Sequence, residues 1–318
     1  MQILFIAGQN DEERLRYKDF VSRWLTAFDN YAPELKIHVY PDNNFAPDNI
    51  EVVLIWKHPY GLLNKFKNLK AIQVMAAGVD HALADKELPN VPIARIIDPD
   101  MAKDLAQYAA AYVLKIVKRI DHWQQKQEEH QWAKQPPFNF SHLTIGIMGL
   151  GAMGQATARI LSNLDIQVAG WSKSSKKIER VDCYAGDKEL DLFLARTDIL
   201  ICMLPLTDST RNILNLQLFR KLKPNAYIMN LGRGEHIIEE DLLFALENGI
   251  LSGAILDVFR AEPLPTEHPF WSHPLITVTP HIASMSNPDT AIAQVVANIH
   301  NVMNKQPLIN IVDRKLGY

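Results

Sequence analysis

Residues 145–154 read IGIMGLGAMG, and this stretch decides the fold of the chain. An apolar run with β-branched residues breaks into Gly149-x-Gly151-x-x-Gly154 and then into a helix-forming segment. The pattern predicts a buried strand, a glycine turn and a helix N-terminus, whose unpaired N–H groups can accept the pyrophosphate of a dinucleotide. Gly149 permits the tight turn, Gly151 lets the backbone approach the phosphates, and Gly154 lets helix and strand pack closely.

Strand and helix patterns alternate on both sides of this stretch. Short apolar runs predict strands at 2–7, 37–40, 52–56, 71–74, 93–95, 167–171, 199–204, 227–231, 254–258 and 276–279. Helical patterns are expected at about 12–28, 101–131 and 288–304, with Pro136-Pro137 closing the second. This alternation predicts parallel sheets of the α/β class.

The glycine turn begins near the middle of a chain of 318 residues, which is long enough for two domains. We therefore expect an α/β fold in which a Rossmann domain with a doubly wound parallel sheet, residues 100–281, binds the nucleotide. It is inserted in a smaller flavodoxin-like α/β domain, built from 1–99 and 282–318, that binds the substrate. A cleft at the junction of the two domains is the expected ligand site.

The composition excludes several classes of protein. With 47% hydrophobic and 22% charged residues the chain resembles a globular protein, and its net charge of -3 gives no reason to expect nucleic acid or an anionic membrane as partner. No apolar stretch approaches the ~18 residues of a spanning helix. The N-terminus carries no basic leader, so a cytoplasmic location is expected. Two cysteines are too few for a metal cluster, and no metal is expected.

Three residues that could do chemistry follow predicted strands of the nucleotide domain. Arg233 comes after 227–231, Glu262 after 254–258, and His281 after 276–279. In doubly wound sheets the carboxyl ends of the strands line the ligand crevice. Taken singly, each would more often be an ordinary surface or loop residue. Together, behind a nucleotide turn, the three predict a catalytic set.

At these positions the chain resembles the D-isomer-specific 2-hydroxyacid dehydrogenase family, and within it the glyoxylate/hydroxypyruvate reductase A branch. The matching pieces are AAGVD at 76–80, GLGAMG at 149–154, LPLT at 204–207, NLGRG at 230–234, DVF at 257–259, EPL at 262–264 and TPH at 279–281. The resemblance implies NADPH-dependent reduction of small 2-oxo acids, glyoxylate to glycolate and hydroxypyruvate to D-glycerate.

The resemblance also implies a role for each of the three residues. Arg233 would clamp the carboxylate of the 2-oxo acid and polarise its carbonyl, since a guanidinium matches a carboxylate in a two-bond fork. His281 would donate a proton to the carbonyl oxygen as general acid. Glu262 would orient the imidazole of His281 and favour its protonated form.

The choice of cofactor depends on the end of the strand predicted at 167–171. An NAD-binding unit carries an acidic residue there for the adenosine ribose, whereas this chain reads WSKSSKK at 171–177. A hydroxyl and an amine suit a 2′-phosphate, so NADP(H) is the preferred cofactor and NAD(H) the alternative, with Ser172 and Lys173 as main contacts and Lys176 as a weaker one. The alternative interpretation of these residues is an ordinary basic loop, exposed to solvent, that binds no phosphate. By resemblance the full set of cofactor-binding residues is Gly149, Gly151, Ala152, Met153, Gly154, Ser172, Lys173, Leu204, Pro205, Thr210, Leu231, Gly232, Arg233, Asp257 and His281.

The family places the substrate carboxylate at the backbone N–H groups of Ala77, Gly78 and Val79, with Arg233 and His281 completing the substrate site. The bland interpretation of AAGVD is a simple strand-to-helix turn. The dipeptide Trp56-Lys57 could face the substrate too.

The helix expected at 101–131 carries an apolar stripe and a second apolar face. The stripe consists of Leu105, Tyr108, Tyr112 and Ile116, and the second face of Ala109, Ala110 and Val113. Because the family dimerises through this region, the second face predicts a homodimer, although the sequence alone would also allow a monomer.

Two other functions remain open at this stage. One is a non-catalytic, dinucleotide-sensing protein of the same fold, against which the complete Arg, Glu and His set argues. The other is a different D-2-hydroxyacid dehydrogenase, or a formate or phosphoglycerate dehydrogenase. Phosphoglycerate dehydrogenases usually carry further regulatory domains, which are not expected in a chain that stops at Tyr318.

Overall fold

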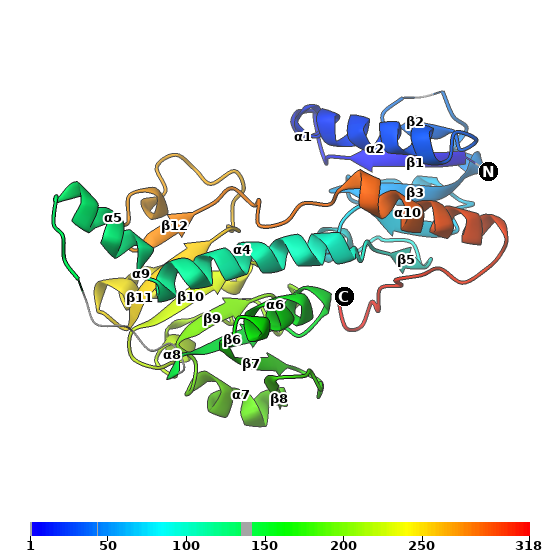
Figure 1. Cartoon of the computed structure of the whole chain (residues 1–318). Helices are drawn as coiled ribbons and strands as arrows, with labels where there is room; N and C mark the ends of the chain where they lie inside the picture. The colour runs from blue at the N-terminus through cyan, green and yellow to red at the C-terminus, as the bar shows by residue number, and fades with distance from the viewer. Residues whose placement is uncertain (1, 43, 135–141) are drawn as a thin grey trace. The chain divides into compact units, whose positions relative to one another are not determined.

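The computed structural model describes residues 2–42, 44–134 and 142–318, so the expected helix end at Pro136-Pro137 lies outside the described residues. The chain forms two compact units, one of residues 1–101 with 286–318 and one of residues 102–285. The first boundary falls inside the first turn of helix α4, Pro99–Val117. Each unit contains one parallel sheet (Figure 1).

The unit of residues 102–285, called here the nucleotide unit, is built on a seven-stranded parallel sheet in the order β12-β11-β10-β9-β6-β7-β8. Its strands are β6 (Thr144–Met148), β7 (Gln167–Ser172), β8 (Val181–Ala185), β9 (Ile199–Cys202), β10 (Ala226–Asn230), β11 (Leu251–Leu256) and β12 (Ile276–Val278). The strand order reverses between β6 and β9, which is the arrangement of a doubly wound Rossmann sheet (Figure 1).

Helices cover both faces of this sheet because each face presents a nearly continuous apolar surface. Helix α4 and helix α6 (Ala152–Asn163) share one core cluster with strand residues such as Ile145 and Ile147. The other face packs against α7 (Gly186–Leu194), α8 (Leu216–Phe219) and α9 (Glu239–Glu247). Because helices cover both faces of the sheet, its polar loops lie at the carboxyl ends of the strands.

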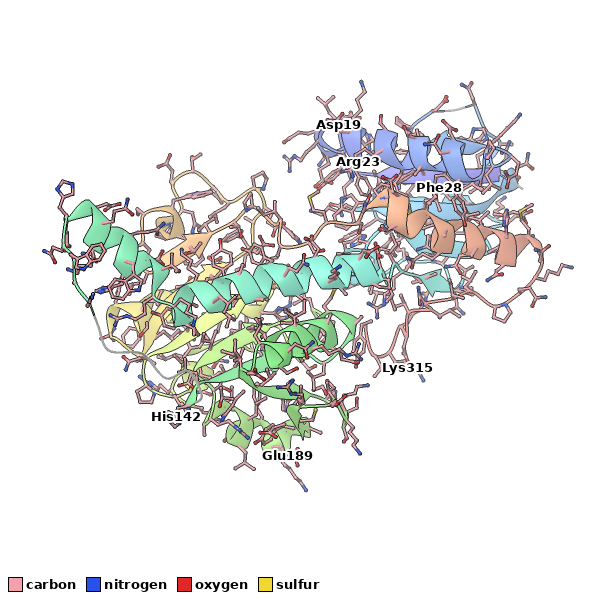
Figure 2. The ribbon with its side chains drawn as sticks, viewed as in Figure 1. Asp19, Arg23, Phe28, His142, Glu189 and Lys315 are labelled. Carbon is pink, nitrogen blue, oxygen red and sulfur yellow. The ribbon has the colours of Figure 1, made fainter. Side chains whose placement is uncertain are left out.

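The other unit, called here the substrate unit, has a five-stranded parallel sheet in the order β2-β1-β3-β4-β5, the flavodoxin-like order. Its strands are β1 (Gln2–Ala7), β2 (Ile37–Val39), β3 (Ile50–Trp56), β4 (Ala71–Val74) and β5 (Ile93–Ala94). Helices α2 (Lys18–Tyr31) and α10 (Pro288–Met303) pack on one face, and helix α3 (Asp80–Leu83) lies on the other. Helix α2 exposes Asp19 and Arg23 and buries Phe28 (Figure 2). The expected fold class is confirmed.

Every strand predicted from the sequence forms, with ends shifted by a few residues, but β8 was not predicted. Two predictions of single helices are wrong. The helix expected at 12–28 is divided at Tyr17 into α1 (Asp11–Arg16) and α2, and the helix expected at 101–131 is divided into α4 and α5 (Ile120–Glu128). The second break follows from Arg119, whose φ of 54° cannot continue a right-handed helix.

The predicted dimer face on α4 is also wrong. Ala109, Ala110 and Val113 are buried in the core cluster of their own unit, with exposed fractions of 0%, 6% and 0%. Of the residues expected to form the stripe on their own domain, Leu105 is buried in that cluster, whereas Tyr108, Tyr112 and Ile116 are half-buried at its edge. Ala109, Ala110 and Val113 therefore pack against the sheet instead of being available to another subunit.

No helix among the described residues is both long enough and apolar enough to cross a membrane.

A buried hydrogen-bonded pair, His58 and Asp85, organises the loop after β3 in the substrate unit. His58 Nε2 lies 3.0 Å from Asp85 Oδ2, and both side chains are at most 1% exposed. Asp85 also accepts hydrogen bonds from the backbone N–H groups of Gly61 and Glu87. Burial lowers the pKa of His58 more than the neighbouring carboxylate raises it. The imidazole is therefore held neutral, with its proton on Nε2 facing Asp85.

Candidate active site

The glycine turn after β6 has the geometry that its sequence predicts. Gly149 has a φ of 103°, and a Cβ there would lie 2.7 Å from the carbonyl oxygen of Met203. At Gly154 a Cβ would lie 1.8 Å from the carbonyl oxygen of Gly149, so only glycine lets α6 approach the turn. A Cβ on Gly151 would meet nothing within 4 Å. Gly149 and Gly154 are thus required by packing, whereas Gly151 borders open space.

The N-terminus of α6 suits an anion. Gly151 is the N-cap residue with extended backbone, no side chain caps the helix, and no acidic residue lies in its first turn, which begins Ala152-Met153. Free N–H groups and the helix dipole therefore act together at this end without a competing carboxylate. These residues fit the pyrophosphate of a dinucleotide cofactor.

The end of β7 carries the residues expected to select the cofactor. Ser172 is buried, and its hydroxyl donates a hydrogen bond to the carbonyl oxygen of Ser174 at 2.8 Å. Lys173 and Lys176 are exposed and form no ion pair with any residue that the structure describes. Ser172 thus shapes the turn, while the two lysines place positive charge around it.

Two further loops follow the strands beside β6. After β9, Leu204 is buried and the hydroxyl of Thr210 donates to the carbonyl oxygen of Pro205 at 2.7 Å. After β10, Leu231 and Gly232 are buried. Both loops follow strand ends at the edge of the sheet that also carries the glycine turn.

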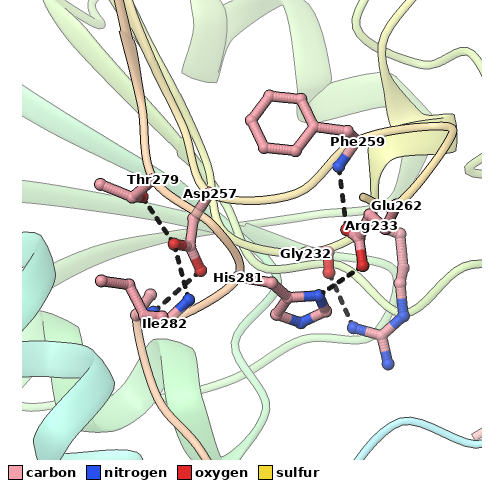
Figure 3. A network of polar contacts seen from close by, with 9 residues as sticks. Gly232, Arg233, Asp257, Phe259, Glu262, Thr279, His281 and Ile282 are labelled. Atoms are coloured by element: carbon pink, nitrogen blue, oxygen red, sulfur yellow. Dashed lines mark hydrogen bonds and ion pairs between the residues drawn. The ribbon is translucent and has the colours of Figure 1, made fainter. Parts of the chain in front are cut away.

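The pair Glu262 and His281 joins the loops that follow β11 and β12. His281 Nδ1 lies 2.9 Å from Glu262 Oε2, and the side chains are 40% and 29% exposed (Figure 3). The other carboxylate oxygen of Glu262 accepts the backbone N–H of Phe259 at 3.0 Å. His281 Nε2 forms no hydrogen bond with a described residue. One ring nitrogen is therefore oriented by a carboxylate and the other is available to a ligand.

Arg233 follows β10 and is held through its backbone. Its N–H donates to Nδ1 of the buried His236 at 3.1 Å, and its carbonyl oxygen accepts from the amide of the buried Asn230 at 2.8 Å. The guanidinium donates from Nη1 to the carbonyl oxygen of Gly232 at 2.8 Å (Figure 3). The three strand-end loops thus bring Arg233, Glu262 and His281 to the same edge of one sheet.

Asp257 lies at the end of β11 and is 1% exposed. Its carboxylate accepts the hydroxyl of Thr279 at 2.6 Å and the backbone N–H groups of Ile282 and Ala283 at 2.9 Å each (Figure 3). These partners stand on both sides of His281 in the chain. The observed contacts of Asp257 are thus to the loop that carries the imidazole.

The sequence-predicted substrate residues lie in the substrate unit. Ala77 and Gly78 are half-buried in the loop between β4 and α3, and Val79 is buried. The guanidinium of Arg95, at the end of β5, donates to the carbonyl oxygen of Ala77 at 3.1 Å. Burial lowers the pKa of Arg95. The loop is therefore braced by a cation that the sequence interpretation did not consider.

Trp56 is the last residue of β3, and Lys57 follows it at the same sheet edge. The ammonium group of Lys57 lies 5.9 Å from the ring centroids of both Tyr17 and Trp56. Lys57 has a φ of 52°, a conformation in which a non-glycine side chain is uncommon. It forms no ion pair with a described residue, and this partly exposed side chain lies near two aromatic rings.

Sequence reasoning missed the residues that hold the predicted set in place. His236 and Asn230 fix the backbone of Arg233, and Thr279 links Asp257 to the loop of His281. An asparagine, threonine or histidine that bonds only to neighbouring loops leaves no periodic signal in a sequence. The one available signal was the proximity of these residues to the NLGRG and TPH motifs.

Comparison with known proteins gives a consistent picture. The model of the D-isomer specific 2-hydroxyacid dehydrogenase NAD-binding domain matches residues 110–283. A glyoxylate/hydroxypyruvate reductase A of Serratia proteamaculans is 39% identical over 301 residues, covering 93% of this chain and 96% of the relative.

Solved structures of relatives are similar over the whole chain. A D-isomer specific 2-hydroxyacid dehydrogenase of Xanthobacter autotrophicus in complex with NADPH and MES has a TM-score of 0.91 at 33% identity, covering 100% of this chain and 99% of that one. An NADPH-dependent glyoxylate/hydroxypyruvate reductase of Sinorhizobium meliloti with NADP and sulfate has a TM-score of 0.89 at 32% identity, covering 100% of both chains. The family resemblance read from the motifs is confirmed: the chain belongs to the D-isomer specific 2-hydroxyacid dehydrogenase family and is an NAD(P)-dependent oxidoreductase.

Proposed function

We propose that this chain reduces small 2-oxo acids with NADPH, converting glyoxylate to glycolate and hydroxypyruvate to D-glycerate. The observation that carries the proposal is the 2.9 Å contact of His281 Nδ1 with Glu262 at the carboxyl edge of the nucleotide sheet. It supplies an oriented proton donor at the same sheet edge as a glycine turn that fits a dinucleotide. The names of the similar reductases support the choice of substrates.

His281 is the general acid in this mechanism. When bound, NADPH supplies a hydride to the carbonyl carbon of the 2-oxo acid, and negative charge develops on the carbonyl oxygen. His281 transfers the proton on Nε2 to that oxygen, which gives the 2-hydroxy acid. Glu262 stabilises the imidazolium before the transfer, and the 40% exposed side chain of His281 recovers its proton from water.

Arg233 binds the carboxylate of the substrate and polarises the carbonyl group. Its guanidinium offers parallel N–H donors that match the two carboxylate oxygens, and its backbone is fixed by Asn230 and His236. The loop of Ala77, Gly78 and Val79 supplies backbone N–H groups to the same carboxylate, with Arg95 bracing the loop. In this assignment residues 1–99 and 282–318 bind the substrate, and residues 100–281 bind the nucleotide.

Preference for NADPH over NADH follows from the end of β7. Lys173 and Lys176 would neutralise and hydrogen-bond the 2′-phosphate, and Ser172 would donate to it by turning its hydroxyl away from Ser174. No carboxylate at this strand end would repel the phosphate. Similar structures that hold NADPH or NADP support this choice. The other expected contacts are those of the glycine turn, Leu204, Pro205, Thr210, Leu231, Gly232 and Asp257.

We further propose a homodimer through residues 101–131. On α5, the apolar side chains of Ile120 and Trp123 are 41% and 37% exposed, whereas the face of α4 that we had expected to bind a partner is buried. Light scattering should give twice the chain mass of 36.1 kDa. The mass of a single chain would reject the dimer and leave the proposed chemistry intact.

The experiment that tests the function is a panel of 2-oxo acids against NADPH and NADH with purified protein. We expect the highest kcat/KM with glyoxylate or hydroxypyruvate and NADPH. His281→Ala should lower kcat by about 10²–10⁴-fold, because it removes the general acid. His300→Ala is the matched control, since His300 also pairs with a glutamate, Glu34 at 3.5 Å, and is similarly exposed at 43%.

Equal turnover of His281→Ala and His300→Ala would remove His281 from the mechanism. Binding of NADPH without turnover of any 2-oxo acid in the panel would favour the dinucleotide-sensing alternative. Faster turnover of another 2-hydroxyacid or 2-oxo acid pair would keep the family chemistry and reject the proposed substrates.

A further inference from the structure

Tyr108 on α4 begins a chain of hydrogen bonds that ends at the loop of His281. Its hydroxyl lies 2.6 Å from Oγ1 of Thr279, and that oxygen lies 2.6 Å from Oδ1 of Asp257. An ionised carboxylate can only accept hydrogen bonds, so Thr279 donates its hydroxyl proton to Asp257. Thr279 Oγ1 must then accept from Tyr108. The direction of both bonds is therefore fixed.

The environment of Tyr108 keeps its hydroxyl a donor. The side chain is half-buried at the edge of the core cluster of the nucleotide unit, and its ring centroid lies 4.9 Å from that of Tyr112. Burial raises the pKa of Tyr108 well above its ordinary value, and the charge of Asp257 acts in the same direction. Tyr108 consequently keeps its proton at any pH at which the protein would be assayed.

The loop held by these hydrogen bonds, residues 279–283, has an unusual backbone. Asp257 accepts the hydroxyl of Thr279 before His281 and the N–H groups of Ile282 and Ala283 after it. His281 itself has a φ of 55°, and its N–H donates to the carbonyl oxygen of Thr279 at 3.0 Å. A backbone that non-glycine residues rarely adopt persists only where its surroundings fix it. Asp257 provides that constraint on both sides of the imidazole.

We propose that Tyr108 is a positioning residue of the reductase: through Thr279 and Asp257 its hydroxyl holds the loop 279–283 so that His281 faces its proton acceptor. The inference rests on the proposed role of His281 as the general acid. Tyr108 itself touches no reacting atom in this account. Because the hydrogen-bond chain ends at Asp257, a proposed cofactor contact, its effect is expected to be larger on turnover than on the binding of the cofactor.

The test begins with Tyr108→Phe, which removes the hydroxyl and keeps the ring. Loss of one neutral hydrogen bond to a positioning chain should lower kcat for glyoxylate by about 3- to 10-fold. KM for NADPH should change less than kcat, because Asp257 keeps its bonds to Ile282 and Ala283 and the hydrogen-bond chain does not include the glycine turn. Tyr227→Phe is the matched control: Tyr227 is also half-buried, burial also raises its pKa, and its hydroxyl bonds to no described residue.

A double-mutant cycle then tests whether Tyr108 acts through Thr279. Thr279→Val removes the middle link, and we expect it to lower kcat at least as much as Tyr108→Phe. Adding Tyr108→Phe to Thr279→Val should have no further effect on kcat, because the hydrogen bonds from Tyr108 to Asp257 are already interrupted at residue 279. Thr279→Ser keeps the hydroxyl and should recover most of the rate lost in Thr279→Val. Thermal unfolding of each variant shows whether a general loss of stability accompanies these changes.

Two results would overturn the proposal. An unchanged kcat in Tyr108→Phe would show that the hydroxyl does not position the acid. Multiplicative effects of Tyr108→Phe and Thr279→Val would show that the two residues act independently. The variant His281→Ala distinguishes failure of this proposal from failure of the proposed function. If His281→Ala turns over glyoxylate at the normal rate, His281 is not the general acid, whatever the effect of Tyr108→Phe.

Discussion

His281 joins a chemically useful side chain to an unfavourable backbone. Its φ of 55° lies in the left-handed region, which costs a residue with a Cβ about 1–2 kcal/mol. Hydrogen bonds from Ile282 and Ala283 to the buried Asp257 offset this cost. Strained residues of this kind cluster at functional sites, where the surrounding structure determines their conformation. The backbone at His281 therefore supports the same assignment as its contact with Glu262.

At the same scale, Lys173 should determine the choice between NADPH and NADH. It is exposed at the end of β7 and forms no ion pair with a described residue. Lys173→Asp replaces a cation that would neutralise the 2′-phosphate by an acceptor for the ribose hydroxyls. We expect the ratio of kcat/KM with NADPH to kcat/KM with NADH to fall by about 10- to 100-fold, the effect of losing one charge-assisted hydrogen bond.

Lys177→Asp in the same exposed loop is the control for charge alone. If both variants change the cofactor ratio equally, the loop attracts the cofactor through its net charge, and Lys173 has no specific contact. Steady-state kinetics with both cofactors at saturating glyoxylate distinguishes these outcomes.

Which single residues could be predicted depended on where they stand relative to strands. Arg233, Glu262 and His281 each follow an apolar run that is recognisable as a strand, so their convergence on one sheet edge could be predicted. Tyr108 could not be assigned to the site, because it lies 171 residues from Thr279 in the chain and its helical spacing indicates only a packing role. Long-range polar contacts of this kind depend on tertiary structure.

At the scale of elements, the glycines between β6 and α6 differ in role: some are required for packing, and another borders the space where a cofactor would bind. At Gly154, Ala would place a Cβ 1.8 Å from the backbone oxygen of Gly149, so the helix must move. We expect Gly154→Ala to lower the free energy of unfolding by about 1–3 kcal/mol, the usual cost of overpacking. Urea unfolding followed by circular dichroism measures this loss.

Gly151→Ala is the comparison, because its Cβ enters open space. We expect its unfolding midpoint to match that of the wild type while KM for NADPH rises by about tenfold, or about 1.4 kcal/mol. A stable Gly151→Ala variant with an unchanged KM would mean that the cofactor does not approach the turn at this residue. An equal loss of stability in both variants would mean that packing alone accounts for the glycines.

The boundaries of elements were predicted well where the sequence carries a terminating signal and poorly where it does not. Helix α10 begins at Pro288, a residue that favours the first helical turn, and the prediction placed it correctly. The break between α4 and α5 lies at Arg119, and no glycine or proline marks it. Strand β8 escaped prediction because its residues are half-buried or exposed, so it lacks a continuous apolar run.

At the scale of the whole molecule, each unit depends on its own buried sheet, and the substrate unit also buries a titratable pair. His58 and Asp85 are fully enclosed, and His58 Nδ1 has no hydrogen-bond partner among the described residues. For Asp85, burial would raise the pKa, but hydrogen bonds from Gly61, His58 and Glu87 outweigh it and lower the pKa below 3.8. The two groups therefore affect stability in separate ranges of pH.

The pH dependence of stability follows from the lowered pKa of His58. In the unfolded chain His58 binds a proton near its ordinary pKa of 6.5, whereas in the folded chain burial keeps it neutral. The unfolded state therefore binds more protons below pH 6.5, so the free energy of unfolding falls as the pH drops from there toward the folded pKa. Above pH 6.5 the contribution of His58 is constant. Within the sensitive range the slope is at most about 1.4 kcal/mol per pH unit.

His58→Gln should flatten the pH dependence of unfolding, because the amide can still donate to Asp85 but cannot titrate. We expect the free energies of unfolding of wild type and variant, measured by urea at pH 5, 6, 7 and 8, to run parallel at pH 7 and 8. If the variant is the less stable protein at pH 7, the two curves should converge at pH 5 and 6. There protonation of His58 stabilises the unfolded chain of the wild type alone, so only the wild type loses free energy of unfolding through this residue. His300→Gln, which alters an exposed histidine, should keep the slope of the wild type. Parallel curves for His58→Gln over the whole range would mean that the folded protein accepts a proton at His58, and the buried pair would then be an ion pair.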